Sequence, residues 1–380
     1  MASQTAETYA AVGVDVDAND RLISRYRQLA TTASRREQLD SIGGFSGLFD
    51  ISALTGYRCP VLASSTDGVG TKVIVASLAD RDGRQSESAC ADRFTGVGRD
   101  LVNHCVNDIL AVGAEPLFFV DYLASNGVSE DQKSEIVAGV ANACRDSGMA
   151  LIGGETADMP DLYMNGYFDL AGTIIGVLEK GNQITGEEIS AGDIVLGLPS
   201  SGLHTNGYSL AREVLGLRRP RGDDDDEAYY AECAKILQDR PWGASEPTLA
   251  DALLEPHRAD WSDLGPHLPM VKGMAHITGG GVQGNIERVL PSTVTVSLEP
   301  SLWQERWDIP PIFDLIQQWG DISSQEMYRV FNMGIGMAFM ASPGDANELL
   351  NLLPSAAKLG EVLPAGGGMG GTCRISGIDD

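Results

Sequence analysis

Ser65-Thr66-Asp67-Gly68-Val69-Gly70-Thr71-Lys72 is the stretch of this 380-residue sequence that says most about fold and chemistry. It follows a short β-type run, Val61 to Ser65, and supplies a carboxylate, two glycines, a hydroxyl group and an ammonium group in close succession. Glycines let backbone N–H groups approach phosphate oxygens, an Asp can hold Mg²⁺, and a Lys can pair with phosphate charge. The stretch has neither a Walker A nor a Rossmann pattern. It predicts either a phosphate- and metal-binding turn or a structural turn that is rich in glycine.

Further acidic residues stand at the ends of other predicted elements. Asp108 lies near the end of an apolar-periodic helix over 101–110, and Asp121 emerges from an apolar strand over 117–123. Gly153-Gly154-Glu155-Thr156-Ala157-Asp158 follows a strand over 149–152. Carboxylates delivered by several strand and helix ends suit Mg²⁺ ions on a nucleotide polyphosphate. The alternative for Asp108 is an exposed position on the polar face of its helix.

The second half contains two polar loops that are rich in glycine. Ser200-Ser201-Gly202-Leu203-His204-Thr205-Asn206-Gly207 leads into a predicted helix over 208–215. Thr278-Gly279-Gly280-Gly281 leads into a predicted helix from Asn285, with His276 just upstream. Such loops predict anion sites at helix N-termini, so we expect a phosphate-bearing ligand. The alternative for His204 and His276 is a loop histidine with ordinary hydrogen bonds.

The composition restricts the possible partners. The formal net charge is −26, which disfavours nucleic acid because the phosphate backbone is repelled. The longest nearly apolar stretch, 168–178, contains Asp169 and is far shorter than the roughly 20 residues of a membrane span. The N-terminus shows no secretory signal, and six scattered cysteines fit a reducing cytosol. We therefore expect a cytoplasmic protein that binds neither nucleic acid nor a membrane. The five histidines form no HxxxH or HExxH pair, so their spacing does not support a zinc site.

The order of the predicted elements indicates a mixed α/β (α+β) fold in two halves. The first half has strands over 61–65, 117–123, 149–152 and 168–178 and helices over 101–110 and 129–147, the latter capped by Ser129. The second half has strands over 193–198, 294–298, 334–341 and 372–375 and helices over 208–215 and 345–353. A hinge at Glu179-Lys180-Gly181 divides the chain into predicted domains 1–178 and 179–380. The acidic stretch 218–245 is predicted to be an inserted, solvated loop, and 366–371 a flexible one.

Taken together, these motifs are recognisable. The sequence closely resembles the aminoimidazole ribonucleotide synthetases, also called phosphoribosylformylglycinamidine cyclo-ligases. The matching segments, in the family's order, are GVDVDA at 13–18, GGFSGLF at 43–49, STDGVGTK at 65–72, CVNDIL at 105–110, GAEPLFFVDY at 113–122, GGETADMP at 153–160, SSGLHTNGYSL at 200–210, HITGGGVQGNIERVLP at 276–291 and EMYRVFNMGIGM at 326–337. As an ordered set they are highly specific.

The resemblance implies a fold and a reaction. Family members pair an N-terminal α/β domain, whose strands form a β-barrel across a homodimer, with a C-terminal α/β domain. The implied reaction belongs to purine biosynthesis and converts formylglycinamidine ribonucleotide into aminoimidazole ribonucleotide with ATP and Mg²⁺. ATP phosphorylates the formyl amide oxygen, a nearby nitrogen attacks the activated carbon, and phosphate leaves. Such chemistry depends mainly on charge neutralisation and positioning.

The resemblance also implies roles for individual residues. Asp67 and Asp108 match the metal-associated acids, and together with His204 and His276 they form the expected catalytic group. The implied ATP-binding residues are Gly68, Gly70, Thr71, Lys72, Gly154 and Glu155, with Gly44 and Phe45 on a mobile segment expected to fold over the nucleotide. The implied substrate-binding residues are Ser201, Gly202, Asn206, Gly279 and Gly280.

The sequence departs from the family pattern at 254–260. The family usually reads Leu-x-Pro-Thr-Arg-Ile-Tyr, whereas this chain has Leu254-Glu255-Pro256-His257-Arg258-Ala259-Asp260. Residues 84–93 also look inserted. The acids and glycines of the nucleotide site are all present, so the departures concern substrate recognition. Two alternatives remain open: a small-molecule kinase resembling thiamine-phosphate kinase, and a non-catalytic nucleotide-binding paralogue.

Overall fold

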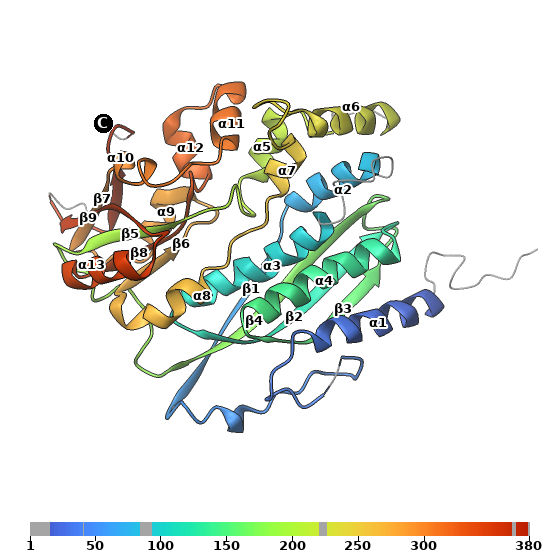
Figure 1. Ribbon diagram of the computed structural model, residues 1–380, viewed down its shortest axis with the longest axis horizontal. Helices are drawn as coiled ribbons and strands as arrows, with labels where there is room; N and C mark the ends of the chain where they lie inside the picture. Colours follow the sequence, from blue (N-terminus) through green and yellow to red (C-terminus); the bar gives the residue numbers. More distant parts are fainter. Residues whose placement is uncertain (1–15, 41, 84–92, 220–225, 367–369, 379–380) are drawn as a thin grey trace, which may run out of the picture.

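The computed structural model describes residues 16–40, 42–83, 93–219, 226–366 and 370–378, which form two α/β parts (Figure 1). The N-terminal part, blue to green in Figure 1, is built on one sheet, and the C-terminal part, yellow-green to red, on another. Among the described residues no strand pairs across the two sheets. We therefore keep 1–178 and 179–380 as the proposed domains.

The N-terminal domain carries a four-stranded sheet with helices packed on it. Its elements are α1 (Val16–Thr31), the 3₁₀ helix η2 (Ile51–Ala53), β1 (Pro60–Gly68), α2 (Lys72–Gly83), α3 (Arg93–Leu110), β2 (Glu115–Asn126), α4 (Glu130–Asp146), β3 (Ala150–Asp158) and β4 (Tyr167–Glu179). The strand order is β1-β4-β2-β3, with β2 and β3 parallel and the other pairs antiparallel.

The two faces of this sheet differ. Helices α3 and α4 pack on one face (Figure 1). Along β1, exposed and less exposed residues alternate, as the period of a strand requires. Leu62 is 58% exposed and Tyr122 on β2 is 39% exposed. Among the described residues, no helix covers these two side chains, although Phe49 packs on Phe118 of the same face.

Helices α3 and α4 pack backbone against backbone. A Cβ atom added at Gly98 would lie 2.0 Å from the carbonyl oxygen of Ile136, and one at Gly139 would lie 2.0 Å from that of Thr95. Both positions therefore require glycine, although glycine inside a helix costs about 1 kcal/mol relative to alanine. The predicted start of α4 at Ser129 is confirmed by a capping box between Ser129 and Gln132.

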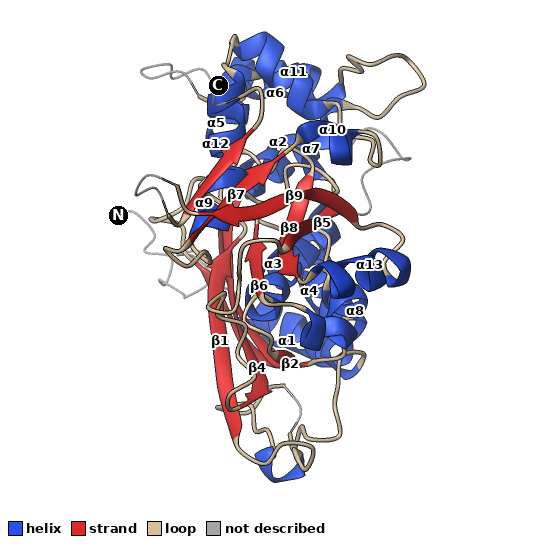
Figure 2. Cartoon of the chain, turned by 90° about the vertical axis from the view of Figure 1, so that its left-hand side faces the viewer, coloured by secondary structure: helices blue, strands red, loops and turns tan. Residues whose placement is uncertain are grey.

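The C-terminal domain is built around a six-stranded sheet (Figure 2). Its elements are β5 (Ile194–Pro199), α5 (Tyr208–Val214), α6 (Asp226–Gln238), α7 (Leu249–Leu254), α8 (Trp261–Leu264), the 3₁₀ helix η3 (Gly265–Met270), β6 (Gly273–His276), α9 (Gly281–Glu287), β7 (Val294–Leu298), α10 (Pro300–Gln304), α11 (Ile312–Gly320), α12 (Ser324–Val330), β8 (Ile335–Ala341), α13 (Pro343–Leu352), β9 (Ala357–Pro364) and β10 (Thr372–Ile375). The strand order is β10-β7-β9-β5-β8-β6, in which only β10 and β7 are parallel. Strand β8 is buried along its whole length.

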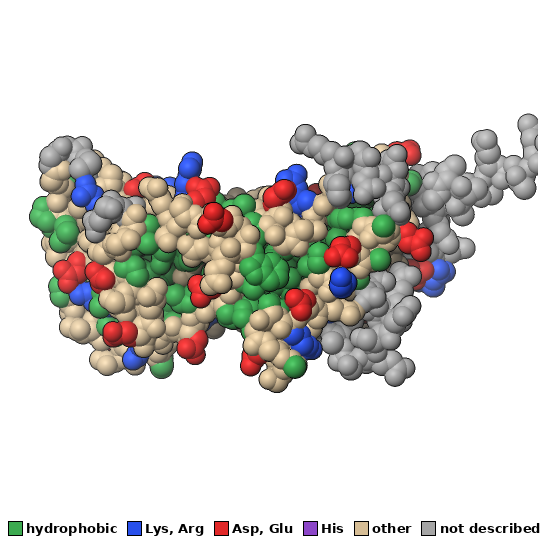
Figure 3. Space-filling view, turned by 90° about the horizontal axis from the view of Figure 1, so that it is seen from above, with side chains coloured by type: hydrophobic (Ala, Val, Ile, Leu, Met, Phe, Trp, Pro, Cys, Tyr) green, Lys and Arg blue, Asp and Glu red, His purple; other side chains and the backbone are tan. Residues whose placement is uncertain are grey.

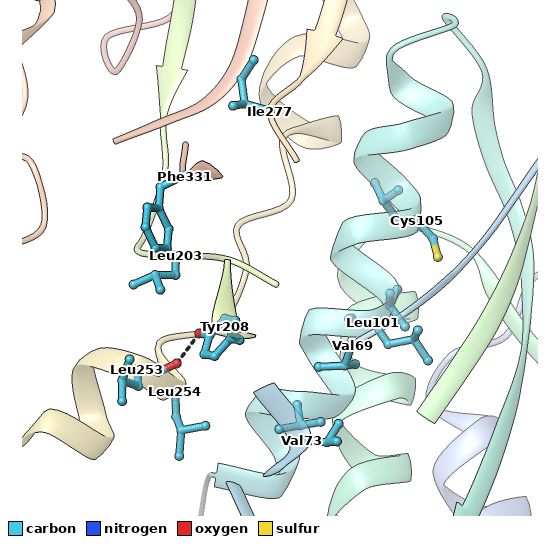
Figure 4. Packing of buried hydrophobic residues seen from close by; sticks show 14 of the residues in the cluster. Val69, Val73, Leu101, Cys105, Leu203, Tyr208, Leu253, Leu254, Ile277 and Phe331 are labelled. Carbon is cyan, nitrogen blue, oxygen red and sulfur yellow. Dashed lines mark hydrogen bonds between the residues drawn. The ribbon is translucent and has the colours of Figure 1, made fainter. Parts of the chain in front are cut away.

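An apolar core joins the two domains. Figure 4 shows Leu101 on α3 and Val73 on α2 in the same buried cluster as Tyr208 and Leu254 of the C-terminal domain. The Tyr208 hydroxyl donates to the carbonyl oxygen of Leu253, so its polar end is satisfied inside this core. The domains are therefore held together by buried side chains, and residues between them can form a fixed site.

The prediction that 218–245 is a solvated loop is wrong. Residues 226–238 form α6, which packs against α2 and buries Tyr229, Cys233 and Leu237. The prediction rested on the run of aspartates that precedes this helix. It did not take account of the helical spacing of the apolar residues that follow. The predicted insertion at 84–93 and the loop at 366–371 fall largely outside the described residues, as does the start of the motif at 13–18.

The other predicted strands and helices are present with shifted ends. Two strands were not predicted, because β6 is only four residues long and β9 carries Lys358 and Glu361. On the face shown in Figure 3, acidic side chains are spread out rather than gathered in one patch. Within the described residues, no helix has both the length and the apolar character needed to cross a bilayer.

Candidate active site

Four of the five histidines meet where the two domains touch. His104 lies on α3, His204 follows β5, His257 follows α7, and His276 ends β6. The ring centroid of His276 is 4.9 Å from that of His104 and 5.1 Å from that of His257. His204 stacks on His257 with centroids 3.8 Å apart. The fold thus gathers imidazoles that lie far apart in the sequence, and we call this group the histidine cluster.

The two predicted metal-associated acids lie beside the histidine cluster, and each is held by one histidine. Nε2 of His104 is 2.8 Å from Oδ2 of Asp67, and Nδ1 of His276 is 2.8 Å from Oδ1 of Asp108. The Ser65 hydroxyl donates to Oδ2 of Asp108 at 2.8 Å. His104 and Asp108 are four residues apart on α3 and so lie on one side of the helix. The structure therefore places Asp67 and Asp108 in one site.

These contacts shift the pKa values of the paired groups. Burial lowers the pKa of His104, but the hydrogen bond with Asp67 and the nearby carboxylate charges outweigh this effect and raise it above its usual value. Burial lowers the pKa of His276, and here burial prevails over the contact with Asp108. Burial raises the pKa values of Asp67 and Asp108, but their histidine partners bring both below the usual value. Of the two imidazoles, His104 therefore protonates more readily than His276.

A second contact joins His276 to His257, whose Nε2 atoms are 3.2 Å apart. Because Nδ1 of His276 faces a carboxylate and donates to it, the Nε2 atom of His276 keeps a lone pair directed at His257. Among the described residues, Nδ1 of His257 has no hydrogen-bond partner, and neither has Nδ1 of His204. The protein therefore satisfies this group of buried imidazoles only in part.

Lys72, a predicted ATP-binding residue, does not line the site that contains Asp67 and Asp108. Its side chain is fully buried, with Nζ 2.8 Å from Oδ2 of Asp100 and donating to the carbonyl oxygen of Glu255 at 2.7 Å. Burial lowers the pKa of Lys72 and raises that of Asp100 to about 6. Lys72 begins α2, and its ammonium group is engaged in joining α2 to α3 and to the 254–260 segment.

The segment 254–260, where the sequence departs from the family pattern, packs on α3. The N–H of His257 donates to Asp100 at 2.7 Å, and Asn103 donates to the carbonyl oxygen of His257 at 2.6 Å. Asn107 donates to the carboxylate of Asp260 at 3.2 Å and accepts from its N–H at 2.9 Å. His257 and Asp260 are both buried. His257 and Asp260, which differ from the family pattern, therefore lie at the contact between the two domains.

A cavity of about 550 Å³ opens beside the acid–histidine pairs. We call it the interdomain cavity, and its polar lining comprises Ser64, Ser65, Asp67, His104, Asp108, Thr185, His276, Thr278, Asn285 and Arg288. Asn285 donates to the carbonyl oxygens of Thr278 at 3.2 Å and Gly279 at 3.3 Å, which fixes the loop that also contains Gly280. Arg288 is exposed at this cavity, and one of its guanidinium nitrogens donates to Oδ1 of Asn285 at 3.2 Å. The cavity thus combines carboxylates on one side with an amide and a guanidinium group on the other.

A second cavity, of about 930 Å³, lies at the opposite edge of the first sheet. We call it the glycine-rich cavity, and its lining includes Tyr26, Arg27, Gly43, Gly44, Phe45, Gly47, Asp121, Gly153, Gly154, Glu155 and Thr156. Within a single chain, Gly154 and Glu155 therefore lie in a different cavity from Asp67. The pairing runs from Asp67 through Gly172 and Asp121 to Gly154, so β3 is three strand spacings, about 14 Å, from β1.

Asp121 differs from the carboxylates of the interdomain cavity. Its Oδ1 atom would lie 2.0 Å from a Cβ atom added at Gly154, so only glycine leaves room for the carboxylate. In the part of the chain that the structure describes, Asp121 forms no ion pair. Burial raises its pKa to about 7. Asp121 is therefore a carboxylate without a cation.

Two of the predicted substrate-binding residues form hydrogen bonds with other parts of the protein that hold the loop after β5 in place. The Ser201 hydroxyl donates to the carbonyl oxygen of Pro256 at 2.6 Å, and the carbonyl oxygen of Gly202 accepts from Asn332 at 2.8 Å. Ser201, Gly202 and the buried His204 are not among the residues that line the interdomain cavity. His204 has a φ of 60°, a strained value for a residue other than glycine.

The remaining predicted residues lie near the junction of the domains. The Asn206 side chain lies beside Gly279, and Gly70, with a φ of 66°, lies near the backbone of Thr205. Gly68 ends β1, and Thr71 directly precedes α2. The 68–71 loop thus runs from the end of β1, next to Asp67, toward the C-terminal domain.

Sequence reasoning missed His104, His257, Asn285 and Arg288. The spacing of His104, four residues before Asp108 on a predicted helix, was a usable signal for that residue. Arg288 follows Asn285 by three residues in a predicted helix, which is also a local signal. No local pattern marks His257, because its partners come from α3 and β6.

Comparisons with known proteins define the class first. Residues 56–178 match the family model for the N-terminal domain of AIR synthase related proteins, and residues 190–370 match the model for the C-terminal domain. The chain is 43% identical over 373 residues to a phosphoribosylformylglycinamidine cyclo-ligase of Anaeromyxobacter dehalogenans, covering 97% of this chain and 99% of the relative. A cyclo-ligase of Geobacillus thermodenitrificans is 41% identical, with coverages of 95% and 97%. The chain belongs to the phosphoribosylformylglycinamidine cyclo-ligase family of the AIR synthase related proteins, which confirms the resemblance.

Solved structures confirm the two-domain fold. A thiamine-monophosphate kinase from Stenotrophomonas maltophilia superimposes with a TM-score of 0.59 at 15% identity, covering 97% of this chain and 98% of that chain. The hydrogenase maturation protein HypE in complex with ATP gives a TM-score of 0.56 at 17% identity, covering 96% and 92%. Identities this low show the fold alone and do not favour the thiamine-phosphate kinase alternative.

Proposed function

We propose that this protein catalyses the ATP-dependent ring closure of formylglycinamidine ribonucleotide to aminoimidazole ribonucleotide in purine biosynthesis. The observation that carries the proposal is the interdomain cavity, in which carboxylates of one domain face an amide and a guanidinium group of the other. This lining suits a reaction between a nucleotide polyphosphate and a second phosphate-bearing substrate. The full-length relationship to cyclo-ligases selects ring closure among the reactions of this fold.

Asp67 and Asp108 are the proposed ligands of Mg²⁺. The residues fit this ion, because Mg²⁺ prefers carboxylate oxygens and usually binds through one or two carboxylates plus substrate phosphates. Each carboxylate accepts two bonds from the protein and therefore retains free lone pairs. When bound, Mg²⁺ supplies neutralisation of phosphate charge.

The chain's own residues then position the reactants. His104, whose proton is retained by Asp67, provides positive charge beside the phosphoryl group that is transferred to the formyl amide oxygen. Arg288, exposed at the cavity, is the proposed partner of the ribonucleotide phosphate. The 278–281 loop, held by Asn285, provides a fixed wall on the same side. Holding the attacking nitrogen against the activated carbon is the main contribution expected from such a rigid site.

We further propose a homodimer that joins the two cavities. The first sheet exposes Leu62 and Tyr122, and the open edges of this sheet are β1 and β3. Closing two such sheets into one barrel about an axis along the barrel places β1 of one protomer beside β3 of its partner. The glycine-rich cavity of one protomer would then adjoin the Asp67 edge of the other. ATP bound across this seam would use residues that lie apart in a single chain.

We place the protein in the cytoplasm. The five cysteines that the structure describes are free thiols, as expected in a reducing compartment. The ATP complex of HypE, which shares the fold, supports ATP as the nucleotide.

The direct test is an assay of the purified protein with ATP, Mg²⁺ and formylglycinamidine ribonucleotide. We expect aminoimidazole ribonucleotide, ADP and phosphate in equal amounts. Transfer of phosphate to thiamine phosphate, without ring closure, would favour the kinase alternative. Nucleotide binding without any turnover would identify a non-catalytic paralogue.

A further inference from the structure

The histidine cluster contains more imidazoles than the proposed reaction requires. His257 in particular has no role in the reaction, although it is buried in the centre of the cluster with an exposed fraction of 1%. Burying a polar ring costs free energy unless its nitrogen atoms find partners. His257 is therefore expected to have a partner or a role outside the proposed reaction.

The spacing of His257 and His276 is the spacing of two ligands on one metal ion. Their Nε2 atoms are 3.2 Å apart. Two nitrogen ligands on one tetrahedral zinc ion, each at about 2.0–2.1 Å, are separated by about 3.3 Å. No movement of either ring is needed to reach this separation.

A third histidine and a supporting carboxylate complete the arrangement. One ring nitrogen from each of His104, His257 and His276 lies within 4.8 Å of the other two, and all three residues are buried. The contact of 2.8 Å between Nδ1 of His276 and Asp108 reproduces the carboxylate–histidine pair that orients metal ligands in proteins. His104 must give up its contact with Thr205 or Asp67 to become the third ligand. Two of the three histidines, His104 and His276, also line the interdomain cavity.

The donor atoms of the cluster suit a transition metal. Nδ1 of His276 faces the carboxylate of Asp108 and donates to it, so the Nε2 atom of His276 presents its lone pair toward His257. Neutral imidazoles select zinc, cobalt or nickel over magnesium, which prefers oxygen ligands. The donor set therefore differs from that of the Mg²⁺ site proposed at Asp67 and Asp108.

We propose that His257 and His276, joined by His104, form a binding site for a divalent transition metal at the inner end of the interdomain cavity. The site goes beyond the proposed ring closure and takes ions of the zinc class. Because the metal would occupy the cavity beside Asp108 and fix His276, its binding inhibits the enzyme. Removal of the metal by a chelator restores activity.

The test is a titration of untagged, chelator-treated protein with Co²⁺, followed by the visible absorption of the bound ion. A Cys59→Ser background removes, as a competing ligand, the one thiol that is exposed among the described cysteines. We expect about one equivalent of Co²⁺, displaced by Zn²⁺ and not by a large excess of Mg²⁺. His257→Gln should weaken binding at least about tenfold. His267→Gln, which removes the histidine outside the cluster, is the matched control and should leave binding unchanged.

Two results would overturn the proposal. One is equal Co²⁺ affinity in His257→Gln and the unmodified chain, and the other is displacement of Co²⁺ by Mg²⁺, which would assign the ion to the carboxylates. If His257→Gln does not fold, zinc-soaked crystals of the unmodified protein decide the matter by anomalous scattering. A peak between His257 and His276 supports the site, and no peak there rejects it.

Discussion

The interdomain cavity and the glycine-rich cavity lie on the same sheet, but their carboxylates differ in hydrogen-bond partners and in pKa. Asp67 and Asp108 are each held by an imidazole, and their pKa values lie below the usual range. Asp121 lies against the backbone of Gly154, and burial raises its pKa to about 7. The first cavity is therefore arranged before any ligand arrives, whereas the second leaves a buried charge for a cation to neutralise. This difference suggests that chemistry occurs in the first cavity and adaptable nucleotide binding in the second.

The largest effect is expected at the buried ion pair below the interdomain cavity. Lys72→Met leaves Asp100 buried without its cation and should lower the free energy of unfolding by about 3–5 kcal/mol. The loss should be smaller at pH 6 than at pH 8, because a carboxyl group whose pKa is raised by burial takes up a proton as the pH falls. Urea unfolding at the two pH values measures both effects. An unchanged midpoint would mean that the pair contributes little to holding α2 and α3 together.

Asp67→Asn and Asp108→Asn test whether the arranged cavity carries the chemistry. Each variant should lose about 2.7–4 kcal/mol of transition-state stabilisation, or roughly a hundred- to thousandfold in rate. Each should also lose about 1–2 kcal/mol of stability, because a histidine loses its charged partner. Turnover at saturating ATP with increasing Mg²⁺ measures the first effect, and thermal unfolding the second. Two variants with normal rates would remove both residues from the active site.

Mixing two inactive variants tests whether the cavities meet across a homodimer. Asp108→Asn disables the interdomain cavity, and Gly154→Ala presses a methyl group against the carboxylate of Asp121. If each site combines the two cavities from different protomers, a randomly mixed sample should regain about a quarter of the normal activity. The activity of subunits mixed after partial denaturation and refolding measures this. Sites contained within one chain would regain nothing.

The effect expected at Asp121 vanishes at low pH and grows as the pH rises. Its folded-state pKa of about 7 exceeds the unfolded value of about 3.9, so the ionised group costs stability as the pH rises through this interval. Asp121→Asn should therefore be more stable than the unmodified chain at pH 8, by up to about 4 kcal/mol, and similar to it at pH 4. Thermal unfolding across this pH range gives the difference. A constant difference at all pH values would show that Asp121 does not titrate in this interval.

The sequence predicts most of the strands, because they carry their own signals, whereas several helices, among them α1, α2 and α11, were not predicted. The capping pair of Ser129 and Gln132 and the buried strand β4 are both local features. The histidine cluster is the opposite case, since His257 finds its partners 150 or more residues away along α3. Lys72 shows a further limit, because a lysine in a glycine-rich loop gives no hint of the buried Asp100 that binds it. Spacing along the chain identified the acids, and only the packing of two domains revealed which groups hold them.

The contact between Gly98 and Gly139 has a consequence for the precision of the site. Helix α3 carries His104 and Asp108, and its position relative to α4 is set by main-chain atoms that touch with no side chain between them. Side chains at a helix contact can change rotamer and shift a helix by fractions of an ångström, whereas two backbones in contact have no such freedom. The positions of His104 and Asp108 relative to α4 are therefore set by contacts between main-chain atoms and not by side-chain rotamers. An enzyme that must hold a nitrogen against a carbon needs its active-site residues at fixed positions. A single methyl group at either glycine would push α3 away from α4 and displace His104 and Asp108.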